Sequence, residues 1–203
     1  MSKGGRFGKY GETKRIARLR QARQAGDRTI KKGGDYPRRR DPQKGRVVLR
    51  KPIILRQAEE TDTDYIRTLS GKVFRRYGPY EELLPLWFET GIAVTILALV
   101  GKRPAGFAML GIPSGEWQEG LAGELLAIAV EPSMHKAGIG DLLMREAVRK
   151  AEMLNMEVLI LHTAPDNLPA KRLFRKHGFL PSEIKRSFYS EGQDALMMVK
   201  DFL

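Results

Sequence analysis

The 203-residue sequence contains no cysteine, which excludes disulfides, thiolate metal sites and a cysteine nucleophile. It has only three histidines, at positions 135, 162 and 177, and no two of them have the spacing of a short metal-ligand pair, so we expect no metal. Long apolar runs are also missing. The longest, residues 92–100, is far shorter than the about 20 residues of a membrane-spanning helix. The N-terminus is charged and lacks the apolar stretch of a signal peptide. Together with the missing apolar runs, this predicts a soluble, cytoplasmic protein without membrane contact.

Positive charge is concentrated in the first quarter of the chain. Residues 1–50 hold 17 Lys and Arg against 4 Asp and Glu, a net charge of +13, whereas the remaining residues hold 19 basic and 20 acidic side chains. Low hydrophobicity with high net charge is typical of disorder, so we expect a disordered basic extension over 1–50 and a folded domain over 51–203. Such a segment binds polyanions by counterion release, which predicts nucleic acid or the ribosome as a partner. A solvated extension with no specific partner is the alternative.

From residue 51 onward, the spacing of apolar residues predicts alternating strands and helices, and hence an α/β fold. We expect strands at residues 52–56, 92–100, 105–110, 125–130, 157–162, 180–189 and 195–202. We expect helices at residues 62–76, 81–89, 141–155 and 169–177. The third helix should bury a stripe made of Leu143, Ala147, Ala151 and Leu154. The strand at 125–130 is apolar throughout, as in strands buried on both faces.

The segment that carries most chemical information follows that buried strand and reads V-E-P-S-M-H-K-A-G-I-G-D over residues 130–141. Gly138 and Gly140 allow a tight turn in which backbone N–H groups converge, and the next helix adds its own free N–H groups and the positive end of its dipole. This arrangement suits a phosphate or pyrophosphate. No Lys-Ser or Lys-Thr follows, so it is not a Walker loop, and Leu143 replaces the third glycine of a dinucleotide fingerprint. Taken alone, the loop is also compatible with a structural turn that binds nothing.

A second motif, N-x-x-A-x-x-L-F-x-x-x-G-F, occupies residues 167–179. The glycine loop fits Q/R-x-x-G-x-G/A, except that His135 stands at the Gln/Arg position. Together the two motifs resemble the GNAT superfamily of N-acetyltransferases, and the order of elements from residue 52 to 203 agrees. The resemblance implies a GNAT-type mixed, mostly antiparallel sheet with a splayed central parallel strand pair and flanking helices. It also implies that acetyl-CoA binds in the wedge between the strands at 125–130 and 157–162.

The resemblance assigns cofactor contacts to particular residues. The pyrophosphate would lie on the backbone N–H groups of residues 137–141, and the pantetheine arm would pair with the backbone of Ile128 and Val130. Asn167 would bond the cofactor arm or fix the helix that lines it. The full implied set is Ile128, Ala129, Val130, His135, Lys136, Ala137, Gly138, Ile139, Gly140, Asp141, Asn167, Ala170, Lys171 and Phe174.

Acetyl transfer to a primary amine, whether at a protein N-terminus, on a lysine or on a small molecule, needs a neutral amine and therefore a base. Glu124, placed just before the apolar strand, is the candidate base, because the family often carries a Glu there. A loop end exposed to solvent is the alternative for Glu124. Glu131 is expected to face solvent. His162 is expected to be packed or to cap a loop, with proton shuttling as its alternative role.

The proton donor is harder to assign. The family often places a Tyr where this chain has Phe174, and phenylalanine cannot donate a proton. Tyr189, expected on the following strand, is the candidate acid in its place. The backbone N–H of Ile128 is a candidate to stabilise the oxyanion. The rival function is a non-catalytic CoA-binding scaffold whose basic tail binds RNA, the ribosome or another polyanion.

Overall fold

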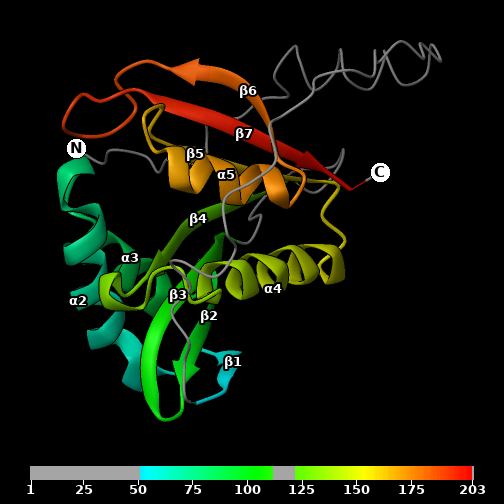
Figure 1. Ribbon diagram of the computed structural model, residues 1–203. Coiled ribbons are helices and arrows are strands. Elements are labelled where there is room, and N and C mark those ends of the chain that lie inside the picture. Colours follow the sequence, from blue (N-terminus) through cyan, green and yellow to red (C-terminus); the bar gives the residue numbers. More distant parts are fainter. Residues whose placement is uncertain (1–50, 112–121, 203) are drawn as a thin grey trace, which may run out of the picture. The chain divides into compact units, whose positions relative to one another are not determined.

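The computed structural model describes residues 51–111 and 122–202, in which one seven-stranded sheet is flanked by helices (Figure 1). The strands follow the order β1-β2-β3-β4-β5-β7-β6 across the sheet. They are β1 (Ile53–Gln57), β2 (Ala93–Val100), β3 (Arg103–Gly111), β4 (Ala122–Val130), β5 (Val158–Thr163), β6 (Leu180–Lys185) and β7 (Ala195–Asp201). The α-helices are α2 (Thr63–Phe74), α3 (Tyr80–Glu89), α4 (Ile139–Met153) and α5 (Leu168–Lys176), with 3-10 turns η2 (Glu60–Asp62), η3 (Arg75–Tyr77) and η4 (Pro132–Met134).

Neighbouring strands are antiparallel at every position in the described sheet except between β4 and β5. A parallel pair needs a crossover connection, and here η4 and α4 supply it. The prediction of a mixed, mostly antiparallel α/β sheet with one central parallel pair is therefore confirmed.

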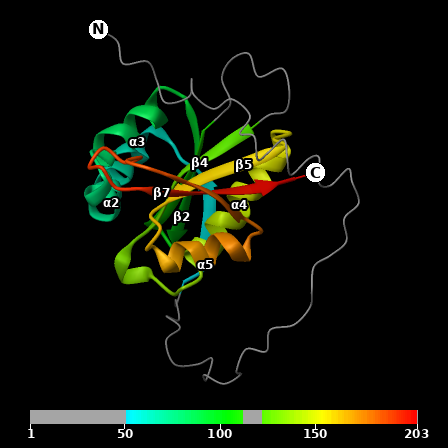
Figure 2. The same cartoon turned by 90° about the horizontal axis from the view of Figure 1, so that it is seen from above.

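Two hydrophobic clusters cover the two faces of the sheet. One contains Leu143, Met144 and Ala147 of α4 together with Phe174 of α5. The other contains residues of α2 and α3, which pack on β2, β3 and β4. Seen from above, α2 and α3 lie side by side and apart from α4 and α5 (Figure 2). This division gives the sheet a face covered by α4 and α5 and a face covered by α2 and α3.

Most predicted elements are present within a few residues of their expected bounds, with two corrections. The strand expected at 180–189 ends at Lys185, because Ser187 has a left-handed φ of 45° and its N–H donates to the Asp194 carboxylate. The helix expected to end at residue 155 ends at Met153. Leu154 is 38% exposed, so it was wrongly placed in the buried stripe. Residues 1–50, for which a disordered basic extension is expected, and residues 112–121 lie outside the described residues.

Candidate active site

The central parallel pair opens along its length. β4 and β5 pair from Ala122↔Val158 to Leu125↔Leu161, and within the described residues no pair joins them beyond that point. β4 nevertheless continues to Val130. A bulge at Leu126 marks the split, because Met109 of β3 lies opposite Ala127 while Leu110 lies opposite Leu125. A bulge bends and twists its strand, which explains why β4 turns away from β5 here. The result is a wedge between the strands.

The backbone of β4 presents polar groups to this wedge. The N–H of Glu131 donates to Ala105 of β3 at 2.9 Å, so residue 131 belongs to a hydrogen-bonded pair with β3. In an antiparallel ladder such pairs alternate with pairs whose N–H and C=O groups point outward. Ile128 and Val130 occupy the outward positions. Their amides and carbonyls face the side on which β5 has separated, and the carbonyl of Val130 lies 3.0 Å from Nε2 of His135.

The glycine loop continues from β4 through η4 to α4. Gly138 caps α4 with a left-handed φ of 85°, a conformation that glycine adopts without steric cost. Lys136 also has a positive φ of 63°. The N-terminus of the 15-residue helix α4 thus emerges at the mouth of the wedge, with backbone N–H groups that no helical carbonyl accepts. Such an end is suited to a phosphate.

Three predicted cofactor residues use their side chains to shape this end of the wedge. His135 does not extend freely from the loop, because its Nε2 lies 3.0 Å from the carbonyl oxygen of Val130. The side chain of Asn167 caps α5 by accepting from the N–H of Ala170 at 3.2 Å. Lys171 donates to the carbonyl of Pro165. The cap agrees with the expectation that Asn167 fixes this helix, and a bond from Asn167 to the cofactor arm stays a prediction.

Asp141, in the first turn of α4, binds the end of α5. Its carboxylate accepts from Lys176 and from His177 and also pairs with Arg145. The hydrogen bond from Lys176, together with that from His177, holds the pKa of Asp141 below its ordinary value, although partial burial acts in the opposite direction. The Asp141 side chain therefore fixes α4 and α5 together, in addition to the expected use of its backbone N–H.

Glu124 and His162 meet beside the split. Glu124 lies inside β4, not before it as expected from the sequence, and it precedes Leu125, the last β4 residue paired with β5. On β5, His162 follows Leu161, which is the residue that pairs with Leu125. Oε1 of Glu124 lies 2.8 Å from Nδ1 of His162, and the side chains are 20% and 4% exposed. Both lie on the face covered by α2 and α3, because Leu125 and Leu161 pack on the opposite face. The expectation that His162 is packed is confirmed.

The structure also places three other candidate residues. Glu131 is largely covered and binds Lys72 of α2 at 3.3 Å, so the expectation that it faces solvent was wrong. Tyr189 lies in the loop between β6 and β7 and not on a strand. It is buried against Tyr77, with ring centroids 4.6 Å apart. Phe174 lies in the core with Phe179. Contact of Phe174 with a cofactor and proton donation by Tyr189 stay predictions.

Sequence reasoning missed the contact between Glu124 and His162. The sequence predicts a separate role for each residue, Glu124 as a base and His162 as a packed or shuttling side chain. The contact depends on how β4 and β5 align, and strands separated by a whole helix leave no local sign of their register. One usable signal was present: polar residues flank two apolar segments, 125–130 and 158–161, that are predicted to be neighbouring parallel strands.

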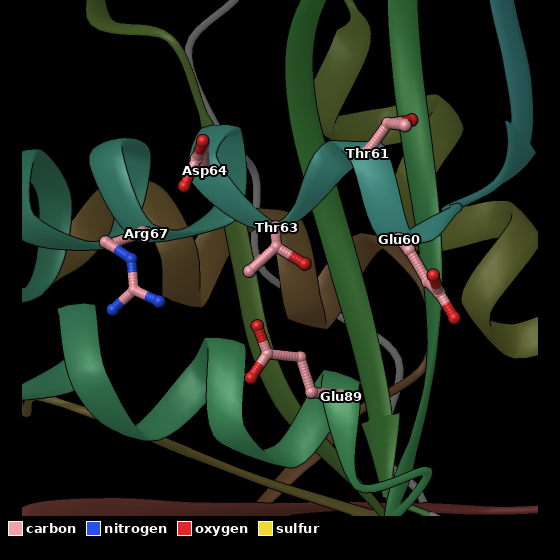
Figure 3. A pocket seen from close by; sticks show the side chains of 6 residues that line it. All are labelled: Glu60, Thr61, Thr63, Asp64, Arg67 and Glu89. Carbon is pink, nitrogen blue, oxygen red and sulfur yellow. The ribbon is translucent and has the colours of Figure 1, made fainter.

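A separate concavity of about 430 Å³ lies between the start of α2 and the end of α3 (Figure 3). It is lined by Glu60, Thr61, Thr63, Asp64, Arg67 and Glu89. None of these residues belongs to β4, β5 or the glycine loop, so the concavity is not part of the wedge site. Within residues 51–111 and 122–202, no three His, Asp or Glu side chains converge as metal ligands. No helix in that part of the chain has the length and apolar character needed to span a bilayer.

The model of the acetyltransferase (GNAT) family matches residues 59–179. An N-alpha-acetyltransferase of Sulfurisphaera tokodaii is 32% identical over 77 residues, which cover 37% of this chain and 46% of that protein, less than half of its length. An N-alpha-acetyltransferase of Saccharolobus solfataricus is 25% identical over 158 residues, 72% of this chain and 91% of that protein. A Salmonella typhimurium acetyltransferase, solved with acetyl-CoA, superposes with a TM-score of 0.64 at 15% identity, covering 74% of this chain and 94% of that one.

Proposed function

Since this chain belongs to the acetyltransferase (GNAT) family, we propose that it transfers acetyl groups from acetyl-CoA to the α-amino group of a protein or peptide N-terminus. The observation that carries the proposal is the contact between Glu124 and His162 at the split between β4 and β5. The α-amine acceptor class is supported by the names of the two archaeal relatives, which are N-alpha-acetyltransferases.

The acid–base properties of the two kinds of protein amine favour the same acceptor. An α-amino group has an ordinary pKa of about 7.7–8.0, so about a tenth of it is neutral at pH 7, whereas a lysine amine has a pKa of about 10.4 and is almost wholly charged. The α-amine therefore needs less help from a base before it can attack the thioester. A lysine acceptor would also need strong desolvation.

In this proposal, each part of the site has one task. Acetyl-CoA supplies the thioester carbonyl that the amine attacks. The outward backbone groups of Ile128 and Val130 hold the pantetheine arm, and the N-terminus of α4 at residues 137–141 binds the pyrophosphate. In the proposal, the N–H of Ile128 stabilises negative charge on the carbonyl oxygen as it develops.

Proton removal falls to the Glu124–His162 pair, which refines the sequence-based assignment of Glu124 alone. Nε2 of His162 is covered by the protein, whereas the carboxylate of Glu124 is the more exposed member of the pair. Glu124 therefore takes the proton from the attacking amine, and His162 holds the carboxylate through Nδ1. Tyr189 stays the candidate donor to the departing thiolate.

The acceptor class is tested with peptides of one sequence that contains an internal lysine. One peptide has a free N-terminus and the other has its N-terminus blocked by a formyl group. We expect the enzyme and acetyl-CoA to modify only the free peptide, with mass spectrometry locating the acetyl group on the α-nitrogen. Equal modification of the blocked peptide, on its lysine, would overturn the proposed acceptor.

We also propose a polyanion partner for residues 1–50, on the basis of the +13 charge of that segment. A cytoplasmic location is proposed with it, because there the segment would have access to ribosomes and RNA. Full-length and truncated proteins lacking residues 1–50 should differ in co-sedimentation with ribosomes at low salt. Equal co-sedimentation would remove this part of the proposal, while acetyl transfer by the truncated protein would be judged separately.

A further inference from the structure

The flat face of the His162 ring is covered by a second aromatic ring. Phe188, in the loop between β6 and β7, stacks on the imidazole with ring centroids 4.3 Å apart and planes inclined by only 17°. The edge of the imidazole meets Glu124 through Nδ1. His162 is thus restrained by a hydrogen bond in the plane of its ring and by a stack perpendicular to that plane.

Phe188 is itself held in place. Tyr189 meets its ring edge-on, at 90° and 5.2 Å, and Tyr189 in turn packs on Tyr77 of η3 at 4.6 Å. The loop is closed locally by a bond from the Ser187 N–H to the Asp194 carboxylate. The stacked ring therefore belongs to a cluster of aromatic side chains that joins β5, the β6–β7 loop and η3.

Two hydrogen bonds also attach this loop to η3. The side-chain amide of Gln193 donates to the carbonyl of Arg76, and the hydroxyl of Ser190 donates to the carbonyl of Tyr77. Because both ends of the loop are anchored, Phe188 cannot move away from His162 without breaking several contacts.

We propose that Phe188 is a positioning residue that acts through His162 and fixes the carboxylate of Glu124. The proposal rests on the proposed function of the Glu124–His162 pair. Tilting of the imidazole would displace Nδ1 and with it the carboxylate that Nδ1 contacts. A ring stacked on the face of the imidazole opposes that tilt, so the Glu124 carboxylate keeps one position relative to the amine. Misplacement of a catalytic group by a fraction of an ångström lowers the rate of the chemical step more than it lowers binding.

The test compares Phe188→Leu with Phe188→Tyr. Leucine fills the space but has no flat face, whereas tyrosine keeps the ring. The matched control is Phe74→Leu, which removes an aromatic contact with Tyr80 and leaves the contact with His162 untouched. We expect Phe188→Leu to lower kcat for a peptide acceptor by about tenfold with the KM for acetyl-CoA unchanged. Phe188→Tyr should restore kcat, and Phe74→Leu should leave it unaltered.

The outcomes separate this inference from the proposed function. If Glu124→Gln and His162→Gln lose activity while Phe188→Leu keeps the wild-type kcat, the positioning role is wrong and the base assignment stands. If Glu124→Gln and His162→Gln both keep wild-type activity, the proposed function fails first. A Phe188→Tyr protein as slow as Phe188→Leu would also overturn the inference. Should Phe188→Leu fail to fold, by thermal melting, Phe188→Met provides the same comparison with a flexible side chain.

Discussion

Substituting each of the two glycines of the cofactor loop by alanine should affect acetyl-CoA binding differently. Gly138→Ala should weaken binding, whereas Gly140→Ala should leave it nearly unchanged. Gly138 has a φ of 85°, and a methyl group added there would meet no atom within 4 Å. The cost of Gly138→Ala is therefore purely conformational. A left-handed backbone costs a residue with a Cβ roughly 1–2 kcal/mol, so either the fold loses about 1 kcal/mol or the loop relaxes and its N–H groups turn away.

Gly140 is the matched control on the same loop. It lies inside α4, and an added methyl group would meet Leu173 at 3.5 Å and Val130 at 3.7 Å, both ordinary contacts. Alanine is a better helix former than glycine by about 1 kcal/mol, so Gly140→Ala should keep or raise the melting temperature. In Gly140→Ala, the backbone N–H groups of the cofactor loop should stay in place.

Acetyl-CoA titration by calorimetry, with thermal melting of the same samples, distinguishes the two substitutions. Each hydrogen bond to a charged group contributes about 1.5–3 kcal/mol, so loss of one N–H contact in Gly138→Ala should weaken binding by about tenfold or more. Gly140→Ala should bind within about twofold of the wild type, since its loop is unchanged. Gly138→Asn should recover part of the loss, because asparagine tolerates a left-handed φ. Equal weakening by Gly138→Ala and Gly140→Ala in folded proteins would refute the assignment of the anion site.

Two further predictions concern the fold around the site. Asp141→Asn removes a carboxylate whose pKa is lowered by Lys176 and His177, so its stabilisation is present at neutral pH and disappears as the pH falls through the lowered pKa. The melting temperatures of Asp141→Asn and the wild type should differ at pH 7 and converge in acid, and a difference that persists in acid would contradict this. Leu143→Ala, at a fully buried position, should cost about 3 kcal/mol in urea unfolding. The 60% exposed Met153 is its control, and an equal loss in Met153→Ala would contradict the packing of α4.

Local signals in the sequence predicted the elements well. α5 begins after Asn167, whose side chain caps it, and Gly178 lies just past its end with a φ of 87°. The glycines that predict an anion site lie at the start of α4, as the motif requires. Such features depend on residues a few positions apart, which is why they can be recognised without a structure.

Contacts between distant segments could not be predicted. Glu124 and His162 are separated by 38 positions, and their contact requires the register of β4 and β5. The end of β6 at Lys185 depends on Asp194, which lies beyond the turn. The stack of Phe188 on His162 depends on both of these arrangements. The sequence alone predicts an anion site at the cofactor loop. The contact between the two residues of the proposed base can be identified only from the pairing of β4 with β5.

The central claim, that Glu124 and His162 form one base, is tested most directly by a double-mutant cycle in single-turnover acetylation of an N-terminal peptide. Glu124→Gln, His162→Gln and the double variant are compared with saturating acetyl-CoA. General base catalysis contributes about 10²–10⁴-fold, so each single substitution should slow the reaction by about 100-fold. The double variant should be no slower than the slower single, because residues that act as one unit are not additive. Single variants that react at the wild-type rate, or effects that multiply in the double variant, would contradict the account.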